Sequence, residues 1–319
     1  MTGGAGFIGS HLVDRLLADG NEVVVLDDLS SGRAANLSPA ARLVRGDVRD
    51  ADLLDLLMAG TGCVFHLAAR VSVQLCIGDW VAAHGVNLGG TIAVLQAAHR
   101  AGNIPVVHAS SAAVYGNRSG AACREADLPL PISPYAADKL AGEHQARAMA
   151  EVHGLPSVGL RFFNVYGPRQ DAASPYAGVI SKFCANRRAD RPHVIFGDGQ
   201  QSRDFIYVGD VVEGLLRAGD LAGRQGGARI FNLCTGVETS LLELARAIDG
   251  LAGRGTSAAR HEPARSGDIR ASRGCPQAAR QGLGFVAGTD IHAGLAALWE
   301  GSGQPVPGLQ PPGGKGGAG

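Results

Sequence analysis

The chain has 319 residues, with 29 basic and 29 acidic side chains and a formal net charge of zero. A neutral chain without a basic stripe argues against nucleic acid and anionic membranes as partners. The six cysteines are scattered, without a C-x-x-C pair or histidines at metal-ligand spacing, so we expect reduced thiols in the cytoplasm and no metal site. No apolar run in the sequence approaches the roughly 20 residues of a membrane span. The length suits one large domain or two closely joined ones.

The chain opens with a glycine-rich segment, Thr-Gly-Gly-Ala-Gly-Phe-Ile-Gly-Ser, followed directly by an amphipathic helical pattern over residues 11–17. Glycines in such a segment permit a tight turn, a close approach of backbone N–H groups to a pyrophosphate, and close packing of helix on sheet. The spacing G-x-x-G-x-x-G is a weak signal by itself in a glycine-rich chain. The loop residues predicted to contact a dinucleotide are Gly3, Gly6, Phe7, Ile8 and Gly9.

Residues 22–28 have the pattern of a buried parallel strand that ends in Asp27 and Asp28. An Asp about 20 residues beyond the glycines can accept hydrogen bonds from both adenosine-ribose hydroxyls and repel a 2′-phosphate. The position favours NAD over NADP, with Arg33 as the feature that argues the other way. The alternative for both acids is a solvated loop carboxylate.

The next two predicted strands also end in residues suited to a dinucleotide. The strand at 43–45 leads to Asp47 and Val48, where Asp47 is placed to reach an adenine amino group. The strand at 63–67 runs into Leu67, Ala68 and Ala69, whose small side chains let a dinucleotide lie across the strand end. Strands and helices alternate throughout this half. That order predicts an α/β fold with a Rossmann-like, doubly wound parallel sheet and its ligand at the carboxyl ends of the strands.

A candidate catalytic group lies between residues 110 and 139. Tyr135 precedes Lys139 by four residues at the start of a predicted helix, with Ser133 as N-cap, so both side chains share one face. A Tyr base near neutrality needs its phenolate stabilised by roughly three pKa units, about 4 kcal/mol. Lys139, the helix N-terminus and an oxidised nicotinamide can each contribute, and Ser111 can share the proton. The alternative for the Tyr135–Lys139 pair is an ordinary surface contact.

The second half of the chain has a looser pattern, which predicts a smaller substrate lobe. Arg203 to Val208 has the pattern of a strand, and Asp210 sits where an N-cap would start a helix at Val211. The predicted division is a cofactor domain of residues 1–163 plus about 207–235, a lobe of about 164–206 and 236–300, and a disordered tail of 301–319.

Together these motifs resemble the extended short-chain dehydrogenase/reductases of the NAD-dependent epimerase/dehydratase family, and within it the nucleotide-sugar 4-epimerases of the UDP-glucose 4-epimerase type. The resemblance runs from Thr2 to about Trp299. It implies NAD as cofactor and C4 epimerisation of a UDP-hexose through a 4-keto sugar. Tyr135 would take the 4-hydroxyl proton, Lys139 would bind the nicotinamide ribose and lower the Tyr135 pKa, and Ser111 would hydrogen-bond the reacting oxygen. Relatives commonly form homodimers through the helix bearing Tyr135 and the one following Asn87.

The same resemblance implies a set of substrate contacts in the second half of the chain. Arg203 and Arg265 would bind the diphosphate, although surface ion pairs are the alternative for both. Asn164 would also contact the diphosphate, and Asp268 the nucleoside ribose. Ser272 stands where a bulky aromatic residue would exclude an N-acetyl group at sugar C2. A serine there predicts that UDP-N-acetylglucosamine is accepted as well as UDP-glucose.

One departure from the family pattern is the first strand, since relatives place about five buried residues before the first Thr-Gly-Gly. Losing about five apolar side chains from the sheet centre would forgo on the order of 10 kcal/mol. We expect a misplaced start or a fragment. For the chain as given, we expect weak NAD retention and low solubility.

Three other functions are alternatives to epimerisation. Nucleotide-sugar dehydratases carry Asp-Glu just after the catalytic Ser or Thr, where this chain has Ala112 and Ala113, which argues against dehydration. Epimerisation or decarboxylation of a UDP-uronate stays open, because any of several arginines can supply the basic residue for a C6 carboxylate. A non-catalytic, NAD-binding regulatory protein is the alternative from another class.

Overall fold

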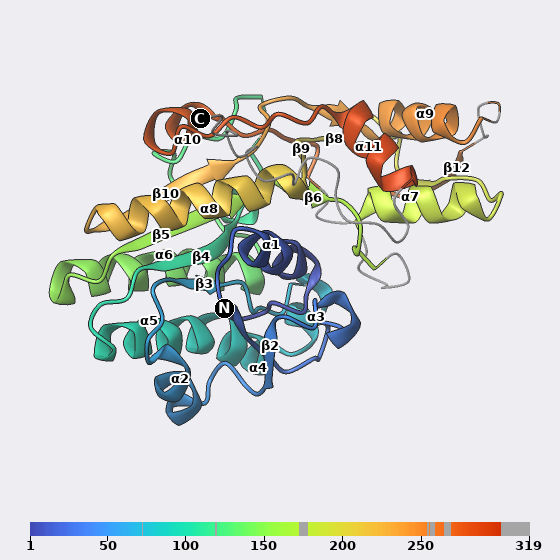
Figure 1. The fold of residues 1–319 in the computed structure, drawn as a ribbon. Helices are drawn as coiled ribbons and strands as arrows, with labels where there is room; N and C mark the ends of the chain where they lie inside the picture. The colour runs from blue at the N-terminus through green and yellow to red at the C-terminus, as the bar shows by residue number, and fades with distance from the viewer. Residues whose placement is uncertain are drawn as a thin grey trace, which may run out of the picture.

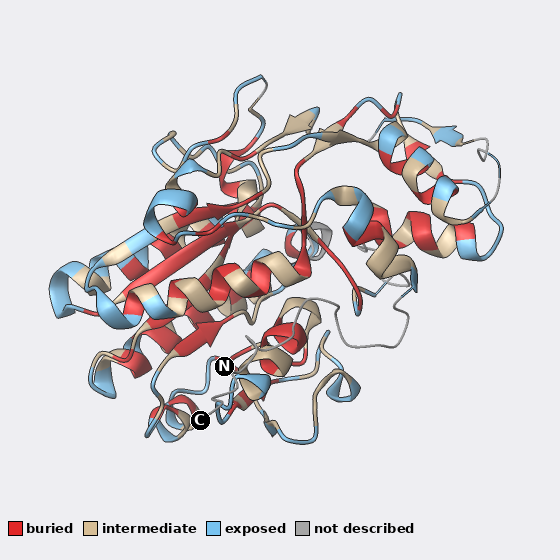
Figure 2. Ribbon diagram, turned by 45° about the horizontal axis from the view of Figure 1, so that its top comes forward, coloured by how far each residue is buried: buried red, intermediate tan, exposed pale blue. Residues whose placement is uncertain are grey.

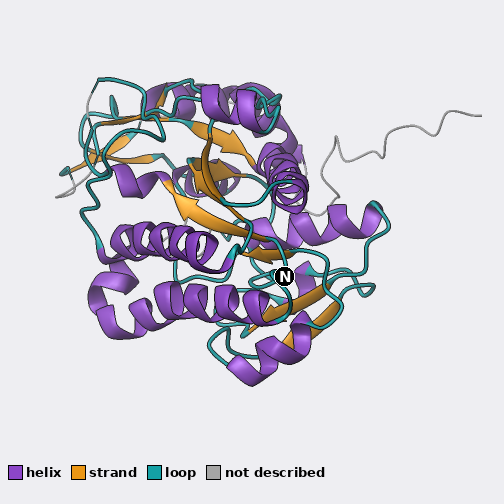
Figure 3. Ribbon diagram, turned by 90° about the vertical axis from the view of Figure 1, so that its left-hand side faces the viewer, coloured by secondary structure: helices purple, strands orange, loops and turns teal. Residues whose placement is uncertain are grey.

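The protein is a parallel β-sheet between two layers of helices, with a smaller lobe beside it (Figure 1). This computed structural model describes residues 1–71, 73–118, 120–171, 178–253, 255, 259–264 and 269–300. Viewed from the side, helices flank the strands on both faces (Figure 3). The strands are largely buried while the exposed residues gather on the outer faces of the helices (Figure 2). The α/β fold class predicted from the sequence is confirmed.

The main sheet is parallel throughout its described strands. In spatial order these are β2 (Arg42–Arg45), β1 (Val24–Asp27), β3 (Val64–His66), β4 (Val106–Ser111), β5 (Ser157–Phe162) and β10 (Ala228–Leu233). Thr2 bridges β1 and β3, because its N–H donates to the Phe65 carbonyl at 2.9 Å while the Gly3 N–H donates to the Leu26 carbonyl at 2.9 Å. Met1 and Thr2 therefore lie between β1 and β3 and lead directly into the glycine-rich loop.

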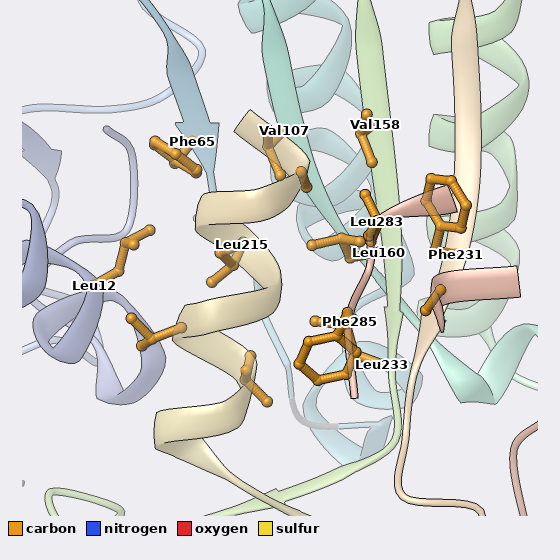
Figure 4. Close-up of a cluster of buried hydrophobic side chains, with 14 of the residues drawn as sticks. Leu12, Phe65, Val107, Val158, Leu160, Leu215, Phe231, Leu233, Leu283 and Phe285 are labelled. Atoms are coloured by element: carbon orange, nitrogen blue, oxygen red, sulfur yellow. The ribbon is translucent and has the colours of Figure 1, made fainter. Parts of the chain in front are cut away.

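Helices cover both faces of this sheet. One face is covered by α1 (Phe7–Ala18), α8 (Val208–Arg224) and α10 (Gln277–Gly282). Their apolar side chains form one core with the sheet, in which Leu12 and Leu215 meet Val107 and Leu160 (Figure 4). The other face is covered by α2 (Ala51–Met58), α5 (Gly90–Arg100) and α6 (Pro134–His153). Two short helices, α3 (Val73–Gly78) and α4 (Trp80–His84), lie beside α6.

One continuous helical stretch, Trp80–Arg100, is long and apolar enough to pass a test for a membrane span, with 44% of its window buried inside the protein. It consists of α4, a π-helical turn (Gly85–Gly89) and α5. Its buried residues Val94 and Leu95 belong to the core against α2 and α6, as in the core helix of a globular protein. The sequence predicted only a helix from about Asn87 onward, so the observed helix begins earlier.

The smaller lobe combines helices with short strands around its own core. Its helices are α7 (Val179–Arg188), α9 (Leu241–Leu251) and α11 (Ile291–Glu300). Its described strands are β6 (Asn164–Tyr166) paired with β9 (Phe205–Tyr207), β7 (Val194–Phe196) paired with β12 (Arg260–Glu262), and β8 (Ser202–Arg203) between β11 (Thr239–Ser240) and β13 (Ala271–Ser272). Two 3₁₀ turns, η1 (Ala34–Asn36) and η3 (Ala112–Tyr115), complete the described elements. The lobe packs beside the carboxyl ends of the main sheet's strands, which is where a substrate would meet the cofactor.

The start of α8 differs from the prediction. The helix begins at Val208 with Tyr207 as N-cap, so the prediction that Asp210 caps a helix at Val211 is wrong. The Asp210 carboxylate instead accepts hydrogen bonds from the backbone N–H groups of Gly288 and Thr289, both at 3.1 Å. Its role is therefore structural: it joins α8 to the segment that precedes α11.

Candidate active site

A cavity of about 380 Å³ opens at the carboxyl ends of the sheet strands. All of the predicted cofactor contacts line it. They are Gly3, Gly6, Phe7, Ile8, Gly9, Asp27, Asp28, Asp47, Val48, Leu67, Ala68, Ala69, Tyr135 and Lys139. Ser111 lines the same cavity. Residues from six separate segments therefore converge on one space, at the position that a parallel α/β sheet reserves for its ligand.

The glycine-rich loop is shaped to let another backbone approach closely. Gly3 has φ +71, and a Cβ there would lie 2.5 Å from the Ala68 nitrogen. A Cβ on Gly9 would collide with the Gly3 carbonyl oxygen. Gly6 is the N-cap of α1 and offers no side chain to cap it, while the first turn of a helix has N–H groups without intrahelical partners. The loop and helix start thus form a cradle for an anion such as a pyrophosphate.

Asp27 is buried at the end of β1, and its carboxylate fixes the loops on either side of it. It accepts hydrogen bonds from the Ala5 and Leu29 N–H groups, each at 2.9 Å. Each carboxylate oxygen still has capacity for a further donor, as a ribose hydroxyl would require. Asp28 is exposed and accepts from the Ser30 hydroxyl at 2.6 Å. These are ordered acids rather than freely solvated loop residues.

Two arginines near this end of the cavity are engaged by carboxylates. Arg33, the feature that argued for NADP, pairs with Asp171 at 2.6 Å. Arg49 pairs with Asp47 at 2.5 Å and holds the pKa of that carboxyl below its usual range. Because the Arg33 guanidinium is paired with Asp171 rather than facing a phosphate site alone, the geometry favours the diol of NAD over a 2′-phosphate.

The predicted catalytic residues come together at the start of α6. Ser133 caps the helix by accepting a hydrogen bond from the Ala136 N–H at 3.2 Å, and Pro134 occupies its first turn, as predicted. The Lys139 ammonium donates to the Ala109 carbonyl at 2.9 Å and lies 5.8 Å from the centroid of the Tyr135 ring. Ser111, from the end of β4, lines the same cavity wall as Tyr135, and its hydroxyl lowers the pKa of the Tyr135 phenol. The surface-pair alternative is excluded, because Lys139 is 5% exposed.

Burial controls the protonation of this group. It raises the pKa of Tyr135 to about 12, and the hydrogen bond to Ser111 offsets only part of that effect. Burial also lowers the pKa of Lys139 to about 8, although the neighbouring Asp138 acts in the opposite direction. The expectation that Lys139 lowers the Tyr135 pKa is therefore not met by the protein's own groups. A Tyr135 base needs a further positive charge from a ligand in the cavity.

Of the predicted substrate residues that the structure describes, Ser111 lines this cavity, whereas Asn164, Arg203 and Ser272 lie in the smaller lobe, outside its lining. Asn164 on β6 donates to the Asp204 carbonyl at 3.2 Å. Arg203 on β8 and Ser272 on β13 are paired in register, so the predicted diphosphate residue lies next to the predicted sugar residue. Arg265 and Asp268 lie outside the described residues. Asn164 is connected to the same region through Asp204, the residue that follows Arg203, so these three residues can contribute to one substrate surface.

Several cavity residues were not predicted from the sequence. They are Leu26, Ser30, Ser31, Gly32, Gly46, Arg49, Arg70, Val71, Val86, Ala109, Ser110, Phe162, Phe163, Val165 and Gln170. Two hydrogen bonds hold the Gln170 side chain at the cavity wall. It donates to the Val165 carbonyl at 3.2 Å and accepts from the Ser181 hydroxyl at 2.6 Å. Nothing in the local sequence marks Gln170. The Ser30-Ser31-Gly32 run directly after the two aspartates was the signal that could have extended the prediction.

A glycine-rich loop opening a helix, with an acidic residue ending the next strand, defines the dinucleotide-binding proteins of the Rossmann type. The Ser111, Tyr135 and Lys139 arrangement in the same cavity narrows this class further. The sequence profile of the NAD dependent epimerase/dehydratase family matches residues 1–234, and the chain belongs to this family.

Known proteins of similar sequence and structure agree with this placement. The chain is 45% identical over 308 residues to the UDP-glucose 4-epimerase of Mycolicibacterium smegmatis, covering 94% of this chain and 96% of that one. The crystal structure of UDP-glucose 4-epimerase from Thermotoga maritima with UDP-glucose superimposes with a TM-score of 0.88 at 33% identity, covering 94% and 96% of the two chains. The structure of MoeE5 in complex with UDP-glucuronic acid and NAD matches with a TM-score of 0.83 at 37% identity, covering 94% and 96%.

Proposed function

We propose that the protein catalyses the NAD-dependent C4 epimerisation of a UDP-hexose, interconverting UDP-glucose and UDP-galactose. The observation that carries the proposal is the convergence of Ser111, Tyr135 and Lys139 on the same cavity as the glycine-rich loop. A dinucleotide bound along the loop therefore ends beside a proton-transfer group. The similarity to UDP-glucose 4-epimerases over nearly the whole chain supports this substrate class.

The cavity fits NAD by its own features. The glycine cradle and the α1 N-terminus suit the pyrophosphate, Asp27 suits the adenosine-ribose diol, and Lys139 is placed for the second ribose. NAD held by these residues would supply reversible hydride transfer at sugar C4. The positive charge of the oxidised nicotinamide also supplies what Tyr135 lacks, because a nearby cation favours the phenolate.

Tyr135 then acts as the base that takes the proton from the sugar 4-hydroxyl and later returns it. Ser111 hydrogen-bonds the phenol and is placed to donate to the same reacting oxygen. Lys139 keeps its position through the Ala109 carbonyl. On the sugar side, we propose that Asn164, Arg203, Arg265 and Asp268 bind the UDP moiety and that Ser272 leaves room for an N-acetyl group at C2.

The experiment is to incubate purified protein, first alone and then with NAD, with UDP-glucose and separately with UDP-N-acetylglucosamine, and to resolve the C4 epimers by chromatography. Formation of the galacto epimer establishes the reaction. Absence of any epimer from either sugar, with NAD bound to the protein, contradicts it.

The second candidate is a UDP-uronate enzyme. The observation that favours it is the similarity to MoeE5, whose structure contains UDP-glucuronic acid and NAD. UDP-glucuronate in a third arm of the same experiment tests it, with epimerisation distinguished from decarboxylation by product mass. Dehydration is disfavoured, because η3 places Ala112 and Ala113 directly after Ser111, and neither can act as an acid or base. A purely NAD-binding regulatory protein is disfavoured by the assembled Ser111, Tyr135 and Lys139 group.

We also propose that the protein acts in the cytoplasm as a homodimer. The α4 region carries exposed apolar side chains, with Trp80 62% and Val81 84% exposed. Paired α5 and α6 helices of two copies would cover such residues. Light scattering at micromolar concentration tests the assembly, and a Val81→Asp variant that leaves the mass at a dimer's value would contradict this interface.

A further inference from the structure

The catalytic helix carries a third side chain on the face that bears Tyr135 and Lys139. Glu143 follows Lys139 by four residues and Tyr135 by eight, so the three lie one above the other along α6. Glu143 is 6% exposed and lies beneath the helix, against the sheet. The proposed reaction gives this buried carboxylate no task.

Glu143 joins α6 to the carboxyl ends of two neighbouring strands. Its Oε1 accepts a hydrogen bond from the Ser110 hydroxyl at 2.5 Å and another from Arg161 Nε at 2.9 Å, and its Oε2 accepts from Arg161 NH2 at 2.7 Å. Ser110 on β4 and Arg161 on β5 are partners in register. One carboxylate therefore fixes the lateral position of α6 against both strands at the level of the active site.

Arg161 also makes contacts on the side away from Glu143, and these hold the Glu143–Arg161 pair in place. Its guanidinium lies 4.8 Å from the centroid of the Tyr115 ring, and the Tyr115 hydroxyl donates to Asn232 on β10 at 2.7 Å. Arg161 also donates to the Glu125 carbonyl at 3.4 Å. The network spans three strands and two loops, and charge-assisted, bidentate hydrogen bonds of this kind constrain geometry strongly.

Ser110 directly precedes Ser111, which lines the cavity together with Tyr135 and lowers the pKa of its phenol. The neighbouring Ala109 carbonyl receives the Lys139 ammonium. The last three residues of β4 thus lie against α6. Of the contacts named here, only Ser110–Glu143 involves no member of the Ser111, Tyr135 and Lys139 group. A shift of this strand end relative to α6 would change the Ser111–Tyr135 distance directly.

We propose that Glu143, acting through Ser110, is a positioning residue that holds the end of β4, and with it Ser111, in place beside Tyr135 on α6. This inference rests on the proposed function. Glu143 does not line the cavity. Ser110 does, but its hydroxyl donates to Glu143, so we expect both residues to act on the reaction through the position of Ser111 relative to Tyr135.

Ser110→Ala is the sharpest variant, because it removes the Ser110–Glu143 hydrogen bond and leaves the buried Glu143–Arg161 pair intact. We expect kcat of the NAD-loaded enzyme to fall on the order of tenfold, since small misplacements of reacting groups are costly. KM and NAD affinity should stay within about twofold of wild type. The acid limb of the kcat–pH profile should move to higher pH, because a weaker Ser111 contact stabilises the phenolate less. In a Ser111→Ala background, Ser110→Ala should have no further effect.

Glu143→Gln and Asp249→Asn form a matched pair of variants. Asp249 makes the other buried carboxylate–arginine contact described here, to Arg187 Nε at 2.7 Å in the smaller lobe. Both substitutions should lower stability, but only Glu143→Gln should move the pH profile. An unchanged pH profile in Ser110→Ala, or full additivity with Ser111→Ala, would overturn the proposal.

If the wild-type protein converts no UDP-sugar, the proposed function fails and the positioning role is tested separately. The probe is then the phenolate absorbance of the NAD-bound protein, with Tyr135→Phe subtracted to isolate Tyr135. A higher titration midpoint in Ser110→Ala supports the positioning role, and an unchanged midpoint overturns it.

Discussion

The Lys139 ammonium lies 5.8 Å from the centroid of the Tyr135 ring, one helical turn along α6. Lys139 is buried and Tyr135 is half-buried, and desolvation disfavours the charged form of each: the pKa of Tyr135 is raised to about 12 and that of Lys139 lowered to about 8. Near pH 7 the protein therefore keeps Tyr135 as the neutral phenol, which is the form that cannot act as a base. A bound cation is required to turn Tyr135 into a base, which couples proton transfer to the presence of the oxidised cofactor.

Removing the phenol should abolish turnover without disturbing the cofactor site. For Tyr135→Phe we expect kcat to fall by about 10²–10⁴, the usual contribution of a positioned acid–base group. NAD affinity, measured by fluorescence titration, should change little. The matched control is Tyr207→Phe, since the buried Tyr207 hydroxyl has no hydrogen-bond partner among the described residues. Similar activity losses in both variants would contradict the assignment of Tyr135.

Replacing Lys139 with Met should stabilise the protein while inactivating it. The Lys139 pKa falls from 10.5 to about 8 on burial, which at 1.36 kcal/mol per unit costs about 3 kcal/mol below pH 8. Lys139→Met removes this cost but also loses the hydrogen bond to Ala109, which stabilises the folded state by about 1 kcal/mol. We therefore expect the free energy of unfolding to rise by about 2 kcal/mol at pH 7.

The pH dependence of that gain has a definite sign. Between pH 8 and 10.5 the unfolded state binds the Lys139 proton and the folded state does not, so wild-type stability from this group rises with pH across that window. The advantage of Lys139→Met should therefore shrink from pH 8 to 10.5. Urea unfolding at several pH values measures it, and a variant less stable than wild type at pH 7 would refute the account.

Cofactor choice should depend on Asp27 more than on Asp28. Asp27→Asn removes a buried charge at the ribose end of the cavity, so NAD affinity should fall about tenfold or more and discrimination against NADP should narrow. The exposed Asp28 serves as the matched control, with Asp28→Asn expected to change NAD affinity less than about threefold. Calorimetric titration with both dinucleotides measures this. Tighter NADP than NAD binding by the wild-type protein would show that Arg33, despite its pairing with Asp171, selects the phosphate.

Substrate size should be controlled at Ser272, which is half-buried on β13 beside Arg203. Ser272→Tyr should abolish turnover of UDP-N-acetylglucosamine by filling the space at C2, while turnover of UDP-glucose stays within a few-fold of wild type. The smaller sugar is the internal control for folding and cofactor loading. Equal loss of both activities would remove Ser272 from the specificity argument.

Much of the cofactor site could be predicted because its determinants are local. The glycine spacing, the strand-end Asp27 and the Tyr135–Lys139 interval are each set within a few residues. Their meeting in one cavity then follows from the topology of a parallel sheet. Ser133 and Pro134 marked the start of α6 for the same reason.

What could not be predicted depends on residues far apart in the sequence. The Arg33–Asp171 pair spans 138 positions, and Gln170 enters the cavity only because a separate helix positions its amide. Asp210 was misplaced because α8 begins directly where β9 ends, without the polar N-cap that usually marks a helix start. The pKa of Tyr135 was misjudged because the sequence shows the charge of Lys139 but not the depth at which both groups are buried.

The central claim is that one hydride leaves sugar C4 and returns to it within a single turnover. The most direct test is to incubate the NAD-loaded protein with UDP-glucose carrying deuterium at C4 and to analyse the product by mass spectrometry and NMR. The account predicts a galacto epimer that retains deuterium at C4, with no exchange into solvent. Absence of the epimer, or an epimer with hydrogen at C4, would contradict it.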